Sequence, residues 1–277
     1  MTTPAVPLKD VSGLPVALSP EGKLEFLEGL PKVAPAVRRL DDMRDVLYQP
    51  TALEPDEMYF MYRGITRSQD APKTSSYGLR YDITVLVPAR VGSEFTKTAG
   101  HFHPKPQGST LTYPEVYEVL YGEAHYLLQR HAVPAGRACS EGINPGRPEE
   151  VIVVKARVGE KVLIPPNYGH VTINAGSRPL AMANWVADGF TSIYEPFKKM
   201  GGAAYYLLDD GRGETKWHQN KRYLNPPPIR FAHPADLSAF GLLPNLPLYQ
   251  CFFENPTAFG WLKEPAAFKW TGVFMDA

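Results

Sequence analysis

Three histidines and one glutamate stand in an order that suits a single divalent metal. His101 and His103 are two residues apart in the segment Gly-His-Phe-His, so in a strand both imidazoles project from the same face. Glu115 opens the next strand-like run, and His170 comes from a distant segment. A set of imidazoles and a carboxylate suits Zn, Fe, Mn, Ni or Co better than Ca or Mg. The sequence therefore predicts one transition-metal site per subunit, with Fe, Zn, Mn or Ni as the candidates.

The residues around these ligands form a two-part pattern. Glu115 is followed, after six intervening residues, by Gly122, and His170 stands five residues after Pro165. This pattern resembles the signature of the cupin superfamily, and it differs in two places. The spacer between the first histidine pair and Glu115 is longer than usual, and Asn167 stands where the second part usually has glycine. Asn also tolerates a positive φ, so the turn can be kept. The remaining histidines lack such a context and are expected in surface or capping roles: His125, His131, His218 and His233.

Composition excludes several classes of function. The 277-residue chain has 29 Lys and Arg against 29 Asp and Glu, so no basic stripe predicts nucleic acid or a membrane surface as a partner. No run approaches the roughly 20 apolar residues of a membrane helix. The only cysteines, Cys139 and Cys251, lie far apart in unlike contexts, which makes a disulfide framework improbable and fits a reducing cytoplasm. We expect a cytoplasmic protein without an export signal.

Short apolar runs separated by turn residues predict an all-β fold. Expected strands include residues 59–64, 82–87, 115–120, 124–129, 150–154, 160–165, 180–186 and 203–208, and residues 37–47 read as a short amphipathic helix. Such spacing favours a sandwich or barrel, here a cupin β-barrel or jelly roll with extensions at both ends. We divide the chain into an N-terminal extension with the short helix (1–58), a cupin β-barrel domain (59–210) and a Pro- and aromatic-rich C-terminal extension (211–277). The composition of the last predicts an ordered segment, packed on the core or on a partner subunit.

Two longer segments point to one family of cupins. Residues 94–103 and 113–122, with their Gly-His-Phe-His and Glu-Val-Tyr motifs, resemble the cupin-type phosphoglucose isomerases, also called cupin glucose-6-phosphate isomerases. The likeness covers roughly Val33 to Asp210. It implies a metal-dependent aldose–ketose isomerase of glycolysis and gluconeogenesis, a homodimer that interconverts glucose 6-phosphate and fructose 6-phosphate. The insert at 104–112 and the C-terminal extension have no counterpart in this resemblance.

The family's functional positions carry over to matching residues of this chain. His101, His103, Glu115 and His170 match the metal ligands, and Glu115 also matches the carboxylate proposed to act at C1 and C2 of the substrate. The remaining positions match residues that hold the sugar phosphate or line the site: Tyr59, Thr84, Thr98, Gly100 and Tyr117.

Elementary chemistry supports the same roles. A divalent metal can hold two adjacent substrate oxygens and polarise a carbonyl, and Glu115 can relay a proton if its pKa suits the task. The hydroxyls of Thr84 and Thr98 and the backbone N–H of Gly100 could bind a phosphate without a large fixed charge. Both a hydride shift and proton transfer through a cis-enediol fit these residues.

Two other functions use the same ligand set. A metal-dependent dioxygenase also needs imidazoles and a carboxylate with open positions. Thr84 and Thr98 argue against a dioxygenase, because an apolar substrate has no phosphate for their hydroxyls to bind. A non-catalytic module that senses sugar or metal is the third reading. The sequence shows no DNA-binding segment and no linker to an output domain, and its ligand set is intact.

Overall fold

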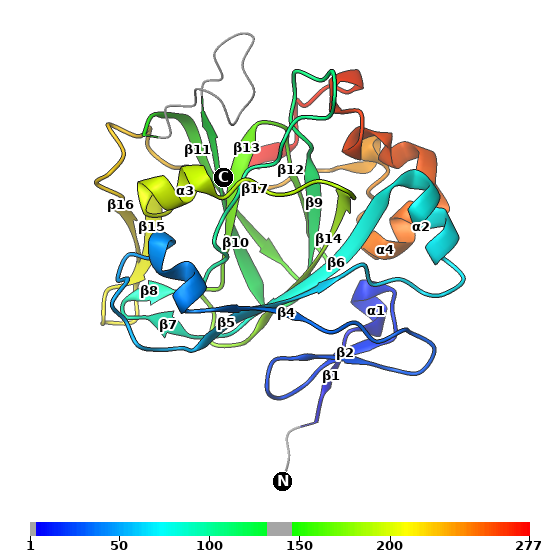
Figure 1. Ribbon diagram of the computed structural model, residues 1–277, viewed down its shortest axis with the longest axis horizontal. Helices are drawn as coiled ribbons and strands as arrows, with labels where there is room; N and C mark the ends of the chain where they lie inside the picture. Colours follow the sequence, from blue (N-terminus) through cyan, green and yellow to red (C-terminus); the bar gives the residue numbers. More distant parts are fainter. Residues whose placement is uncertain (1–3, 132–145) are drawn as a thin grey trace.

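Two β-sheets enclose the centre of the molecule in the computed structural model, which describes residues 4–131 and 146–277 (Figure 1). The six-stranded sheet has the order β12-β9-β14-β6-β5-β4 and the five-stranded sheet the order β13-β10-β11-β17-β18. Neighbouring strands are antiparallel except β11 and β17. The strands of the first sheet are β4 (Ala36–Arg39), β5 (Glu57–Arg63), β6 (Leu79–Leu86), β9 (Glu115–Tyr121), β12 (Lys161–Ile164) and β14 (Leu180–Ala187). Those of the second are β10 (Glu123–His131), β11 (Pro148–Arg157), β13 (Tyr168–Ile173), β17 (Arg230–Pro234) and β18 (Phe274–Asp276).

Smaller elements surround these sheets. Strands β1 (Val6–Pro7), β2 (Val16–Leu18) and β3 (Leu24–Phe26) form a separate three-stranded sheet, and β7 (Arg90–Val91), β8 (Glu94–Phe95), β15 (Tyr205–Asp209) and β16 (Thr215–Gln219) form a four-stranded one. The α-helices are α1 (Lys9–Ser12), α2 (Ala71–Tyr77), α3 (Glu195–Met200) and α4 (Leu248–Glu254). The 3₁₀-helices are η1 (Asp41–Val46), η2 (Ser238–Phe240), η3 (Pro256–Leu262) and η4 (Pro265–Ala267). None of the helices in the described part of the chain is long and apolar enough to cross a membrane.

The six-stranded sheet is buried on both faces, which explains why its strands read as near-continuous apolar runs. Its inner face shares a core with the five-stranded sheet, where Val119 and Met182 belong to the same cluster as Leu127 and Val153. The outer face forms a second core with the terminal segments of the chain. There the Trp185 indole donates a hydrogen bond of 3.0 Å to the carbonyl of Leu248, at the start of α4.

The all-β jelly-roll prediction is confirmed, as two facing sheets. The division of the chain at 59 and 210 stays a prediction. Both flanking segments nevertheless contribute strands to the main sheets, β4 from the first and β17 and β18 from the last. The predicted strands are present with shifted ends; the one expected at 203–208 is β15, which runs over Tyr205–Asp209. Of the two cysteines, Cys251 is buried and free, and Cys139 lies outside the described residues.

The helix predicted over 37–47 is wrong in its first half. Residues Ala36–Arg39 form β4, which pairs with β5, and only Asp41–Val46 is helical, as the 3₁₀-helix η1. The apolar residues Leu40, Met43 and Val46 explain the difference, because their spacing of three matches the three residues per turn of a 3₁₀-helix. All three are buried, with exposed fractions of 3%, 0% and 2%.

A buried ion pair fixes the C-terminal extension to the six-stranded sheet. Lys161 Nζ lies 2.9 Å from Glu118 Oε1, and the other oxygen of Glu118 accepts a hydrogen bond of 2.8 Å from the backbone N–H of Leu248. The side chains of Lys161 and Glu118 are only 5% and 2% exposed. Burial raises the pKa of Glu118 to about 7, although Lys161 opposes this rise.

Replacing Lys161 by Met should destabilise the fold by about 3–5 kcal/mol, because it leaves a buried carboxylate without its counter-charge. The loss of unfolding free energy in Lys161→Met, relative to the parent protein, should grow as pH rises from 5 to 8. Without Lys161 the folded-state pKa of Glu118 lies further above its unfolded value, so the stabilisation by the bound proton is lost as pH rises through the folded pKa. Urea unfolding at both pH values measures this.

The control is Lys155→Met, which breaks the half-exposed pair with Glu123 and should cost less than about 1 kcal/mol. Equal losses in the two variants would show that the buried pair has no special role.

Candidate metal centre and substrate cavity

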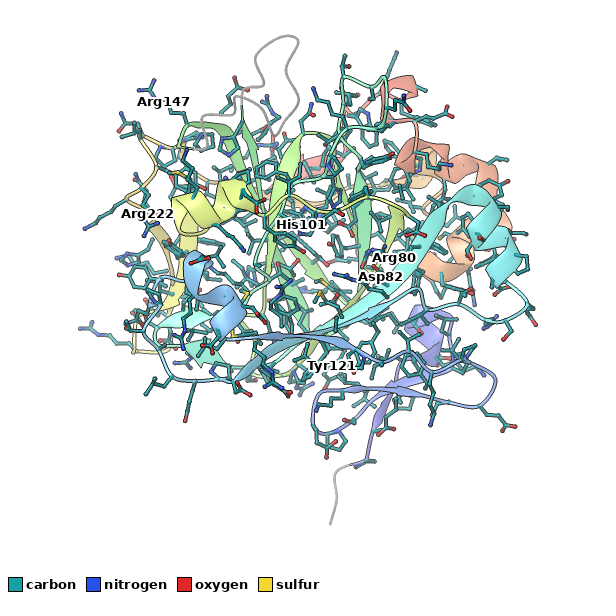
Figure 2. All side chains as sticks on the ribbon, in the orientation of Figure 1. Arg80, Asp82, His101, Tyr121, Arg147 and Arg222 are labelled. Atoms are coloured by element: carbon teal, nitrogen blue, oxygen red, sulfur yellow. The ribbon has the colours of Figure 1, made fainter. Side chains whose placement is uncertain are left out.

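A cavity of about 380 Å³ opens on the inner face of the six-stranded sheet. The register of the strands explains which side chains face it. Val186 of β14 pairs with Arg80 of β6 on one side and with Glu115 of β9 on the other. Residues two apart on these strands share a face, so Asp82 and Tyr117 also point inward. Figure 2 shows His101 toward the middle of the view and Arg80 and Asp82 on β6, and all three line this cavity.

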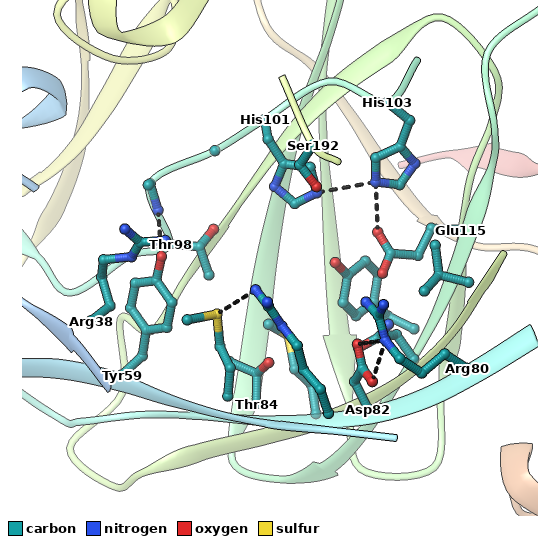
Figure 3. Close-up of a pocket in the computed structure, with 18 of the residues that line it drawn as sticks. Arg38, Tyr59, Arg80, Asp82, Thr84, Thr98, His101, His103, Glu115 and Ser192 are labelled. Carbon is teal, nitrogen blue, oxygen red and sulfur yellow. Dashed lines mark hydrogen bonds and ion pairs between the residues drawn. The ribbon is translucent and has the colours of Figure 1, made fainter. Parts of the chain in front are cut away.

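The four predicted metal ligands meet at one place. Their ligand atoms all lie within 4.8 Å of one another. His101 Nε2 is 3.0 Å from His103 Nε2, and Glu115 Oε2 is 3.4 Å from His103 Nε2 and 3.3 Å from His170 Nε2 (Figure 3). Such converging nitrogen and oxygen atoms can hold a metal ion.

Three different parts of the fold deliver these ligands. Glu115 begins β9 in one sheet, and His170 belongs to β13 in the other. The spacing of His101 and His103 had predicted a regular strand, and this prediction is wrong. Single bridges instead hold this segment, which pairs His101 with His170 and Phe102 with Ile193.

The neighbours of His103 and Glu115 leave a lone pair on each of their ligand atoms for a metal ion. His103 Nδ1 lies 2.9 Å from the carbonyl oxygen of Tyr113 and donates to it in the tautomer that leaves a lone pair on Nε2. Glu115 Oε2 is buried, and its neighbours are His170 Nε2 at 3.3 Å and His103 Nε2 at 3.4 Å, without a well-formed hydrogen bond. Ring nitrogens that bind a metal carry no proton to donate, so a cation is the partner that satisfies this oxygen. The residues present therefore fit a divalent metal.

Burial sets the charges of the cluster. It lowers the pKa of His103 to about 4 and the pKa of His101 well below its usual value, which keeps both imidazoles neutral. Burial works to raise the pKa of Glu115, but interactions with His170 and His103 outweigh it, so this pKa lies below its usual value. Neutral imidazoles and an ionised carboxylate are the forms that bind metals.

The positions predicted to hold the substrate line the same cavity: Tyr59, Thr84, Thr98, Gly100 and Tyr117. The Tyr59 hydroxyl accepts a hydrogen bond of 3.3 Å from the backbone N–H of Ala99, and Thr98 Oγ1 accepts one of 2.9 Å from that of Thr172. Each hydroxyl therefore keeps its own proton to donate. The Tyr117 hydroxyl lies 3.1 Å from His170 Nε2.

Two backbone positions depend on residues that allow a positive φ. Gly100 has a φ of 75°, and a Cβ at this position would lie 2.5 Å from Val171. The close approach of two backbones beside the ligands thus requires glycine. Asn167 has a φ of 71°, which confirms that the turn keeps a positive φ with asparagine in place of glycine.

Several lining residues were not predicted from the sequence: Arg38, Arg63, Arg80, Asp82, Asn184 and Tyr194. Two carried a usable signal. Asn184 is the polar residue of an apolar strand, and Asp82 stands two residues before Thr84 on one strand. The guanidinium groups also change the expected character of the cavity, which had been predicted to bind phosphate without a large fixed charge.

Residues 37–225 match the family model described as Glucose-6-phosphate isomerase (GPI). The chain belongs to the glucose-6-phosphate isomerase family. The glucose-6-phosphate isomerase of Pyrococcus furiosus is 31% identical over 206 residues, which cover 73% of this chain and 95% of that one. The enzyme of the same name from Thermococcus kodakarensis is 29% identical over 199 residues, covering 70% and 90% of the two chains. The family resemblance stated from the sequence is thus confirmed.

Solved structures give a weaker likeness. Oxalate decarboxylase from Bacillus subtilis at pH 4.6 overlaps with 51% of this chain and 28% of its own, with a TM-score of 0.31 and 17% sequence identity. Recombinant oxalate oxidase in complex with glycolate has the same TM-score and identity, and the overlap covers 48% of this chain and 51% of that one. These values are too low to bear on the chemistry.

We expect His101→Ala and His170→Ala to lose bound metal while keeping most of the β fold, since each change removes one imidazole from the cluster. Metal content by mass spectrometry and far-ultraviolet circular dichroism measure the two properties. His233→Ala is the control, because His233 is exposed on β17. Full metal occupancy in both cluster variants would show that the ligand set is wrong.

Proposed function

We propose that this protein is a metal-dependent aldose–ketose isomerase that interconverts glucose 6-phosphate and fructose 6-phosphate. The observation that carries the proposal is that one cavity contains both a metal-ligand cluster and hydroxyl donors for a phosphate. Membership of the glucose-6-phosphate isomerase family and relatives that bear this name support the same reaction. A homodimer and a cytoplasmic location stay predictions from the sequence.

His101, His103, Glu115 and His170 would hold one divalent transition metal, for which Fe, Zn, Mn and Ni are the candidates. When bound, such an ion supplies electrophilic polarisation of the substrate carbonyl and of the adjacent hydroxyl. Burial lowers the pKa of His103 to about 4, so this imidazole is neutral and able to bind a metal at neutral pH.

Glu115 is the proposed acid–base group. The reaction moves hydrogen between C1 and C2, and the hydroxyl proton moves between the oxygens on these carbons. The carboxylate is ionised and buried beside the ligand cluster, so it can take a proton from one carbon and return it to the other. The Tyr117 side chain contacts both His170 and Glu115 and fixes their orientation.

The phosphate would bind to Tyr59, Thr84, Thr98 and Gly100 on the neighbouring wall of the cavity. The Tyr59 and Thr98 hydroxyls each accept a backbone hydrogen bond, so each can still donate its own proton to a phosphate oxygen. Thr84 lies on the same inward face of β6 as Asp82 and has an exposed fraction of only 9%. A hydroxyl there has little water to bond and gains from a phosphate oxygen.

The direct test is a coupled assay on fructose 6-phosphate, in which glucose 6-phosphate is followed through its dehydrogenase. We expect no activity after chelation and recovery when a divalent metal is added back. Failure of every candidate metal to restore turnover would refute the proposed reaction. Oxygen uptake by the loaded protein, measured with an electrode, would instead favour a dioxygenase.

Glu115→Gln should lower kcat by roughly 10²–10⁴-fold, because glutamine can still offer an oxygen to a metal but cannot exchange a proton. Metal content must be measured on the assayed sample, so that loss of metal is separated from loss of the acid–base group. Deuterium from solvent at C2 of the product reports whether a proton-transfer route is used. A metal-loaded variant that turns over at near the parental rate would reduce Glu115 to a ligand.

A further inference from the structure

One guanidinium in the cavity has a buried donor without a partner. Arg38 lies on the edge strand β4, directly opposite Tyr59 of β5 in the register. Its Nε donor is buried and has no hydrogen-bond partner in the part of the chain that the structure describes. A buried donor on a charged group without a partner is costly, so this position is suited to an acceptor from a ligand.

Neighbouring arginines show how the protein satisfies such groups elsewhere. Arg39, the next residue on β4, forms ion pairs with Asp56 and Glu57 at the surface. Arg80, on the cavity wall, is held by Asp82 at 2.9 Å and by Asp188 at 3.1 Å. Arg38 interacts with the Tyr59 hydroxyl and, through its charge, with Tyr194 and Asp42. Among the described residues no carboxylate lies within 4.0 Å of it, so no close ion pair neutralises its charge.

The position of Arg38 relative to the metal ligands suits the far end of a small ligand. The ring of Tyr194 separates the two groups, with its centroid 5.7 Å from Arg38 Cζ and 5.6 Å from the centre of the His101 ring. Figure 3 shows Arg38, Tyr59 and Thr98 together on one side of the cavity and His103 and Glu115 on the other. The guanidinium therefore lies on the side of the Tyr59 and Thr98 hydroxyls and away from His103 and Glu115.

Hydroxyls alone do not neutralise a phosphate dianion. A guanidinium offers several N–H donors in a planar fork that matches two phosphate oxygens, and the resulting charge-assisted hydrogen bonds are about twice as strong as neutral ones. Packing against the Tyr194 ring holds the group in place without competing for these donors.

We propose that Arg38 is a substrate-binding residue that pairs with the dianionic phosphate of the sugar and so selects phosphorylated over free sugars. This inference rests on the proposed function. Because Arg38 acts at the end of the substrate that does not react, its removal weakens binding more than it slows the chemical step.

The test compares Arg38→Met with the control Arg39→Met, which changes net charge equally on the same strand. Calorimetry with fructose 6-phosphate, and separately with inorganic phosphate, is carried out on metal-loaded proteins of verified metal content. We expect Arg38→Met to raise both dissociation constants roughly 10- to 100-fold, and KM likewise, with a smaller change in kcat. Arg39→Met should bind both ligands like the parent.

Arg38→Lys keeps the charge but loses the planar fork, so it should bind with intermediate affinity. It also serves as the test if Arg38→Met does not fold. Parental affinity for both ligands in the Arg38 variants would overturn the proposal, and so would an equal loss in Arg39→Met, which would indicate only a long-range effect of charge.

The two proposals fail in different ways. A wild-type protein that shows no isomerase activity but binds phosphate through Arg38 contradicts the reaction and keeps this inference. An active wild-type enzyme whose Arg38 variants keep the parental KM contradicts this inference alone.

Discussion

The convergence of four ligating side chains between two sheets is the constraint on which the rest of the structure depends. Glu115 comes from the six-stranded sheet and His170 from the five-stranded sheet, while His101 and His103 come from the segment that bridges to β13. Their ligand atoms lie within 4.8 Å of one another because the two sheets pack face to face in one particular relative position. The close backbone contact at Gly100, where no side chain fits, is part of the same requirement. A change in the packing of the two sheets would therefore also change the geometry of the ligand cluster.

The cavity has two chemically different ends. At one end burial keeps His101 and His103 neutral, while contacts with His170 and His103 keep Glu115 ionised, and this combination favours binding of a cation. At the other end Arg38 and the hydroxyls of Tyr59 and Thr98 favour an anion. A sugar phosphate has the matching polarity, since its neutral carbonyl end needs an electrophile and its phosphate end needs donors and positive charge.

The sequence predicted the ligand set and most strands because both depend on local patterns. The spacing of Glu115 from Gly122 and of Pro165 from His170 reflects turns, and turns are set by a few residues. The strands β6 and β9 were likewise visible as short apolar runs bounded by turn residues. Arg38 was not recognised, because only pairing of β4 with β5 turns it toward the cavity. The same pairing overrode the helical pattern of residues 37–39. The aromatic composition of the C-terminal segment predicted that it is ordered, but nothing in it showed which face of the six-stranded sheet it covers.

X-ray absorption spectroscopy of the protein loaded with Zn, Ni or Mn reports the atoms around the metal and so checks the proposed ligand set. We expect one ion per chain with three imidazole nitrogens and one carboxylate oxygen, and a change in the light-atom ligands when fructose 6-phosphate is added. A sulfur ligand, fewer than three imidazoles, or a coordination shell that does not respond to the sugar phosphate would contradict this expectation.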